Sequence, residues 1–127
     1  MTPLVLLPGM MCDERLFAPQ ISELSKQREV HFVQISGHKT ISELAADVLN
    51  NAPPVFALAG LSMGGIVAME VLSQASERVE RLALLDTNPL AELSDVAKRR
   101  GPQIDAVRNG QLKEIIRDEM KPNYLFD

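Results

Sequence analysis

The sequence predicts an α/β fold, a doubly wound parallel sheet with helices on both faces. Short apolar segments alternate with helical segments, and this alternation requires a parallel sheet with right-handed crossovers. The apolar segments show no polar–apolar alternation, which is typical of strands covered on both faces. The chain has 127 residues, of which 46% are hydrophobic and 24% charged, so it is long enough to form one core.

Four strands are expected, because four short apolar runs are each followed by turn residues. Pro8-Gly9 ends the first run and Ser36-Gly37 follows the second. The predicted strands are residues 4–7, 30–35, 55–59 and 81–85.

Three helices are expected between these strands. Residues 13–26 have apolar side chains on one face, and Pro19 is expected to start a second, longer piece. Thr40-Ile-Ser-Glu43 is a capping box, and the helix that it opens has a clear apolar face. The third helix, from Met63 to about Ser76, is apolar on several sides, as expected for a helix packed centrally on a sheet.

The segment Gly60-Leu-Ser-Met-Gly64 fits G-x-S-x-G and lies between a predicted strand and a predicted helix. Such a turn is very sharp, so its serine is strained, and glycines on either side avoid a collision of Cβ atoms. Ser62 is then lifted to the start of a helix, where the N–H of Met63 can face developing negative charge. The alternative is an ordinary strand-to-helix turn with Ser62 as the N-cap.

Further candidate residues follow strands at the same edge of the sheet, where ligands bind in open parallel sheets. Asp86 comes after the fourth strand and is a candidate triad acid, although a turn or cap is the more common role for Asp. Both histidines, His31 and His38, precede Ser62 in the chain. A serine without a positioned base is a poor nucleophile. His38 is an alternative candidate for that base, although we do not expect its strand to be adjacent to the serine strand.

Composition excludes several classes of function. The net charge is −4 with no basic stripe, which argues against a nucleic-acid partner, and no apolar run is long enough to span a membrane. The apolar N-terminus lacks a basic region, so we expect a strand there and no signal peptide. The single Cys12 favours a reducing cytoplasm. One cysteine and two scattered histidines do not form a zinc site, so no metal or organic cofactor is expected.

After Pro89 the pattern changes to charged helical segments, which we expect to be lid or packing helices. Residues 90–100 form an amphipathic segment that we expect to break at Gly101-Pro102. Shorter helices are expected at 104–108 and 112–120, and we expect no further strand. The basic run within the first segment, Lys98-Arg99-Arg100, is expected to be a solvated face.

The serine turn, together with Leu6-Leu-Pro-Gly-Met-Met11, resembles the α/β-hydrolase superfamily, and most of all its small bacterial esterase or lactonase-type members. The resemblance covers essentially the whole chain, and the serine turn is its most specific motif. It implies that residues 1–89 are the N-terminal part of an α/β-hydrolase core, with strand order 2-1-3-4. Residues 90–127 would be the beginning of a helical lid.

The resemblance also implies roles for single residues. Ser62 would be the nucleophile, and the N–H groups of Met10 and Met63 would form the oxyanion hole. Pro8 stands where the family has the histidine of its His-Gly-x loop. That change is tolerable, because the loop only has to keep the N–H of Met10.

The departure from the family is large. Its members have two more strands after the lid, then the acid and the histidine, whereas this chain ends at Asp127. We therefore expect this chain to be the N-terminal portion of a hydrolase and to be inactive as 127 residues alone. The catalytic base is expected outside these residues. The acid is expected there as well, unless Asp86 takes that role. We also expect an unpaired edge at the fourth strand, which favours a dimer or higher assembly through that edge or through exposed helix faces.

Three functions stay open. The first is a serine hydrolase that acts on a carboxylic ester, lactone or thioester by acyl transfer. The second is a lyase or a C–C hydrolase of the same fold, because lid and loops choose the substrate. The third is a catalytically silent domain that binds or assembles.

Overall fold

The computed structural model describes residues 1–124, and these fall into two compact units that meet between Pro89 and Leu90. Residues 125–127 of the predicted lid segment lie outside the described residues. The assignment of the second unit to a lid stays a prediction. Among the helices of residues 1–124, none has the length and apolar character needed to cross a membrane.

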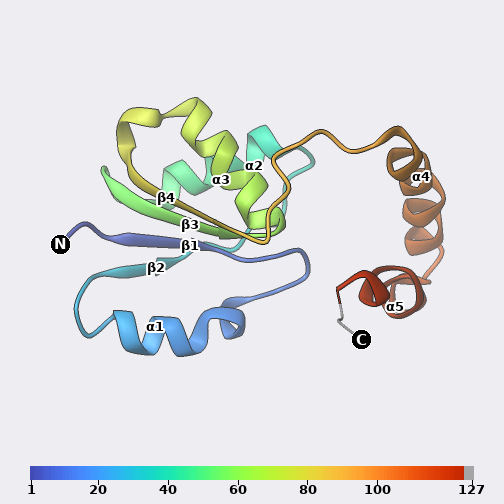
Figure 1. Cartoon of the computed structure of the whole chain (residues 1–127), viewed down its shortest axis with the longest axis horizontal. Helices are drawn as coiled ribbons and strands as arrows, with labels where there is room; N and C mark the ends of the chain where they lie inside the picture. Colours follow the sequence, from blue (N-terminus) through green and yellow to red (C-terminus); the bar gives the residue numbers. More distant parts are fainter. Residues whose placement is uncertain (125–127) are drawn as a thin grey trace. The chain divides into compact units, whose positions relative to one another are not determined.

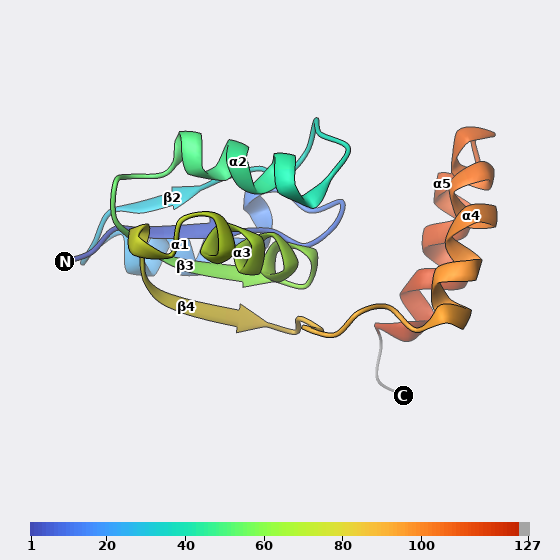
Figure 2. The same cartoon turned by 90° about the horizontal axis from the view of Figure 1, so that it is seen from above.

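The first unit contains a parallel sheet of four strands in the order β2-β1-β3-β4, which confirms the predicted order (Figure 2). Each strand pairs with a neighbour over all or nearly all of its length, and β2 is the shortest of the four. The strands are β1 Leu4–Leu7, β2 Val30–Phe32, β3 Phe56–Leu61 and β4 Val79–Leu85.

Helices cover both faces of this sheet (Figure 1). The 3-10 turn η1 (Glu14–Phe17) and α1 (Ala18–Leu24) lie on one face. The helices α2 (Ile41–Asn51) and α3 (Met63–Gln74) lie on the other, and the short 3-10 turn η2 (Ser76–Arg78) precedes β4.

Two hydrophobic clusters explain why the strands are apolar on both sides. Val5 and Leu7 belong to the cluster with α2 and α3, whereas Leu4 and Leu6 belong to the cluster with Phe17. Because successive strand residues point to opposite faces, every position of β1 is buried.

Several boundaries differ from the predicted ones. The strand β2 ends at Phe32, although Val33 and Ile35 beyond it are still buried. The strand β4 begins at Val79, two residues before the predicted start. The capping box of α2 is confirmed, since the Thr40 hydroxyl accepts from the Glu43 amide and the Glu43 carboxylate accepts from the Thr40 amide.

The second unit corrects one prediction. The helix α4 runs without interruption from Ser94 to Arg108, so the predicted break at Gly101-Pro102 is wrong. Proline removes one hydrogen bond to the carbonyl four residues earlier, that of Lys98. Since residues 98–102 are all exposed, water can satisfy that carbonyl and the helix continues.

The predicted helix at 112–120 is divided in the structure. A short α-helical turn, α5 (Leu112–Glu114), leads into a π-helical segment, Ile115–Met120. A 3-10 turn at Lys121–Asn123 follows. Gly110 before α5 has a φ of 86°, a left-handed conformation that favours glycine.

Candidate functional site

The serine turn has the strained backbone expected of it. Ser62 joins β3 to α3 with φ 51° and ψ −115°, a conformation that L-residues rarely adopt and that costs of order 1–3 kcal/mol. Its side chain is at the N-cap position but makes no capping hydrogen bond, and the residue is exposed. Ordinary N-capping therefore does not account for this serine.

The glycines of the motif are required by close backbone contacts. A Cβ atom on Gly60 would lie 2.3 Å from the carbonyl oxygen of Gly64. A Cβ atom on Gly64 would lie 2.4 Å from the carbonyl oxygen of Leu7 and 2.5 Å from that of Pro8. These contacts bring the loop after β1 directly against the serine turn.

The two predicted oxyanion donors are on either side of this contact. Met63 is the first residue of α3, so its N–H has no partner within the helix. Met10 follows Gly9, whose Cβ position would be 3.8 Å from the carbonyl oxygen of Leu61. The structure thus places the loop and the turn together, and binding of an oxyanion by Met10 and Met63 stays a prediction.

The end of β4 also contacts the serine turn, which sequence reasoning missed. The N–H of Ser62 donates to the carbonyl of Leu85 at 2.8 Å, and the Thr87 hydroxyl is 3.1 Å from the carbonyl oxygen of Ser62. Thr87 also approaches Gly65 closely. One feature of the sequence could have indicated this contact: the second glycine of Gly64-Gly65, which the G-x-S-x-G motif does not require.

Asp86 is exposed and has a φ of 46°, in the left-handed region. Asp is one of the few residues other than glycine that enter this region readily. The turn interpretation is therefore compatible with the structure, and a role for Asp86 as triad acid stays a prediction.

Neither histidine belongs to a strand next to that of Ser62. His31 is in β2, paired through Val5 with Leu58, which precedes Ser62 by four residues along the chain. That offset corresponds to roughly 13 Å along a strand and two strand spacings, about 10 Å, across the sheet. His38 follows β2, and its Nε2 is 3.8 Å from Asp47 Oδ1 on α2.

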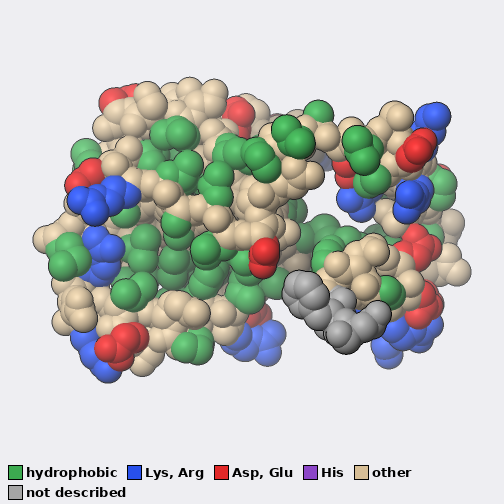
Figure 3. All heavy atoms as spheres, viewed as in Figure 1, with side chains coloured by type: hydrophobic (Ala, Val, Ile, Leu, Met, Phe, Trp, Pro, Cys, Tyr) green, Lys and Arg blue, Asp and Glu red, His purple; other side chains and the backbone are tan. Residues whose placement is uncertain are grey.

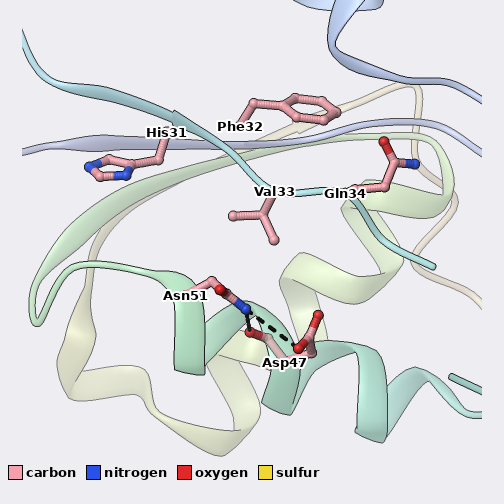
Figure 4. Close-up of a pocket in the computed structure, with 6 residues that line it drawn as sticks. All are labelled: His31, Phe32, Val33, Gln34, Asp47 and Asn51. Carbon is pink, nitrogen blue, oxygen red and sulfur yellow. Dashed lines mark hydrogen bonds between the residues drawn. The ribbon is translucent and has the colours of Figure 1, made fainter. Parts of the chain in front are cut away.

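A pocket of about 360 Å³ lies between β2 and α2 (Figure 4). The side chains of Asp47 and Asn51 face it from α2, where the Asn51 amide donates to the Asp47 carbonyl at 2.8 Å. Residues 31–34 line it from the strand side. Ser62, Met10, Met63 and Asp86 are not among its lining residues, and no sequence signal indicated this pocket.

Comparison with known protein families gives one match that covers nearly all of the chain. Residues 2–122 match the thioesterase domain family. The chain belongs to this family. Its strand order and helices are those of part of an α/β-hydrolase, so the resemblance found in the sequence is confirmed.

A curated relative of this thioesterase-domain chain is the pimeloyl-[acyl-carrier protein] methyl ester esterase of Aliivibrio salmonicida. The two are 32% identical over 94 residues, which are 68% of this chain and 36% of the relative. The corresponding esterase of Pectobacterium carotovorum is 29% identical over 102 residues, or 74% of this chain and 40% of the relative. The chain therefore spans well under half the length of these relatives.

Solved structures give the same fold. An extracellular α/β-hydrolase from a Paenibacillus species aligns with a TM-score of 0.67 at 22% identity, over 86% of this chain and 53% of that one. The enol-lactonase of Burkholderia xenovorans aligns with a TM-score of 0.65 at 27% identity, over 88% of this chain and 50% of that one.

Proposed function

We propose that this chain supplies the nucleophile and the oxyanion-binding amides of a serine hydrolase that acts on a carboxylic ester, lactone or thioester. The observation on which the proposal depends is the backbone of Ser62, which has a φ of 51° at the N-terminus of α3. The side chain of Ser62 makes no capping hydrogen bond. Strain of this kind is concentrated at functional sites. The names of the relatives, two methyl ester esterases and an enol-lactonase, support the same class of reaction.

The proposed reaction is acyl transfer. Ser62 Oγ attacks the acyl carbon, a base accepts the hydroxyl proton, and the carbonyl oxygen becomes negative between the N–H groups of Met10 and Met63. The C–O or C–S bond to the leaving group then breaks, and the alcohol or thiol takes the proton. Water repeats the sequence and releases the acid. Each oxyanion donor contributes about 3 kcal/mol to transition-state stabilisation.

The base is proposed to come from outside these residues. His31 belongs to β2 and His38 pairs with Asp47 of α2, so neither is on a strand next to that of Ser62. Asp86, at the end of β4, stays a candidate for the acid. A small acyl compound is proposed as the substrate. A cytoplasmic setting is proposed as well, since Cys12 is a free thiol.

Because neither histidine is on a strand next to that of Ser62, one other function is favoured, that of a catalytically silent domain that binds or assembles. The two proposals differ in one measurable property. A hydrolase site reacts with a fluorophosphonate at Ser62, and a silent domain does not.

The experiment is the intact mass of the protein purified from its natural source, before and after a fluorophosphonate probe. We expect one adduct, located on Ser62, which Ser62→Ala abolishes. Ser36→Ala, at an exposed serine in the turn after β2, should leave the adduct unchanged. No adduct would favour the silent domain, and an adduct that persists in Ser62→Ala would overturn the proposed nucleophile.

A further inference from the structure

Thr87, just beyond β4, reaches back to the serine turn. We propose that Thr87 is a positioning residue that orients the Met63 amide toward the oxyanion. The inference rests on the proposed function, because it concerns the same site. Thr87 is 25 residues from Ser62 in the chain, and the G-x-S-x-G motif does not include it.

Both backbone polar groups of Ser62 are held by the segment that ends β4. Its N–H donates to the Leu85 carbonyl at 2.8 Å. Its carbonyl oxygen accepts from two amides of α3, those of Gly65 at 2.9 Å and Ile66 at 3.3 Å, and from the Thr87 hydroxyl at 3.1 Å. The single hydroxyl proton of Thr87 has a second acceptor, the Leu85 carbonyl, also at 3.1 Å. Thr87 thus ties the strained residue to the end of the neighbouring strand.

The carbonyl of Ser62 and the N–H of Met63 belong to one planar peptide unit. In a trans peptide these two groups point in opposite directions. A donor that fixes the direction of the Ser62 carbonyl therefore fixes the direction of the Met63 N–H as well. A hydrogen bond to the carbonyl also polarises the peptide, which strengthens the N–H as a donor.

Gly65 gives an independent reason to assign this contact. A Cβ atom at Gly65 would lie 1.8 Å from Thr87 Oγ1 and 2.7 Å from Thr87 Cβ. Any side chain at position 65 would therefore displace Thr87 from the turn. The second glycine after Ser62 is thus explained by the approach of the Thr87 side chain.

A group that acts through the Met63 amide has a distinct kinetic effect. The oxyanion carries its full charge only in the transition state, so misdirecting one donor lowers kcat and leaves KM almost unchanged. Substitution of a residue with only a structural role would lower the stability of the fold and would not lower kcat selectively at constant KM.

The test compares two variants of the protein as its natural source produces it: Thr87→Val, which removes the hydroxyl at nearly constant shape, and Thr87→Ser, which keeps it. Amide hydrogen exchange is measured at Ser62 and Gly65, whose N–H groups donate to the carbonyls of Leu85 and Ser62, and hydrolysis of a p-nitrophenyl ester is measured on the same samples. We expect exchange at these amides to rise about tenfold in Thr87→Val, with exchange at Leu58 unchanged. We expect kcat to fall about tenfold at constant KM, and Thr87→Ser to remain within about twofold of wild type. If Thr87→Val does not fold, Thr87→Ala takes its place.

The two readouts separate the two proposals. If the wild-type protein does not turn over the ester or take up the fluorophosphonate, the proposed function fails, while hydrogen exchange still tests whether Thr87 holds the turn. Unchanged exchange in Thr87→Val would overturn the inference, and so would Thr87→Ser behaving like Thr87→Val. A change in KM alone, with kcat unaffected, would overturn the assignment to the Met63 amide.

Discussion

At the scale of single residues, the serine turn requires glycines, because there is no room for a Cβ atom at three of its positions. Gly60, Gly64 and Gly65 each have backbone or side-chain atoms less than 3 Å from where a Cβ would be. Gly9, in the loop that faces them, has no such neighbour closer than 3.7 Å. The same site therefore contains glycines that are sterically required and one that is not.

Gly64→Ala should strongly destabilise the first unit. Its new Cβ would meet the carbonyl oxygens of Leu7 and Pro8 at 2.4 and 2.5 Å, and the backbone at the end of β1 cannot move aside cheaply. We expect a loss of about 3 kcal/mol in the free energy of unfolding, measured by urea denaturation. Gly9→Ala is the matched control and should be neutral or stabilising by up to ~1 kcal/mol. Equal stability of the two variants would contradict this account of the turn.

At the scale of the elements, the capping box at the start of α2 includes a titratable group, the carboxylate of Glu43. The carboxylate of Glu43 accepts from the backbone amide of Lys39 and interacts with Thr40, and these hydrogen bonds lower its pKa. A lowered folded-state pKa means that the charged carboxylate stabilises the folded state. This contribution is complete above the unfolded pKa of about 4.3 and is lost as the pH falls through the folded value.

The unfolding free energy should therefore differ between wild type and Glu43→Gln in a pH-dependent manner. We expect the difference to be largest near neutral pH and to shrink below about pH 4.3. Denaturation series between pH 3 and pH 7 measure it. Glu77→Gln, at an exposed position, changes the net charge equally and serves as the control. A difference between wild type and Glu43→Gln that is independent of pH would contradict the prediction.

The end of α2 is held by one arginine. The guanidinium of Arg78 donates to the carbonyls of Leu49, Ala52, Pro53 and Pro54 at 2.8 to 3.1 Å, and it lies 5.6 Å from the centroid of the Phe56 ring. The carbonyl of Leu49 is among the last four of the helix, which have no partner within it.

Arg78→Lys should release this end of the helix, because an ammonium group cannot reproduce the planar fork of donors. We expect the free energy of unfolding to fall by about 2 kcal/mol, measured by urea denaturation. Arg81→Lys, at an exposed position on β4, should change it by less than ~0.5 kcal/mol. A loss of the same size in Arg81→Lys would show that the effect does not depend on the carbonyl contacts of Arg78.

These elements also show what the sequence could predict. Local signals sufficed for β1, which Pro8-Gly9 ends, and for the capped start of α2. They failed at Pro102, because exposure of the helix decides whether a proline breaks it. The contacts of Thr87 and Arg78 were unpredictable, since they join residues more than 20 positions apart. In the candidate site, the serine turn was therefore predictable from the sequence, whereas the contact of Thr87 with that turn was not.

At the scale of the whole chain, the two edges of the sheet differ. The strand β2 has only three residues, and short edge strands are poor templates for pairing. The strand β4 has seven residues and is paired on one side by β3. Leu84 and Leu85 on it are 40% and 43% exposed, and Figure 3 shows hydrophobic side chains gathered over the strands of the first unit.

We predict that these 127 residues by themselves self-associate through β4. A two-fold axis at this edge would pair β4 antiparallel with its copy, which satisfies the free backbone groups and covers the exposed leucines. Light scattering should show a mass that rises with concentration toward that of a dimer, and Leu84→Lys should return it toward the monomer, because an edge lysine opposes pairing. Val55→Lys, at a 49% exposed position before the central strand β3, should leave the mass of wild type unchanged. A monomer at the highest concentration reached, or an equal effect of both substitutions, would show that β4 is not the surface through which the copies meet.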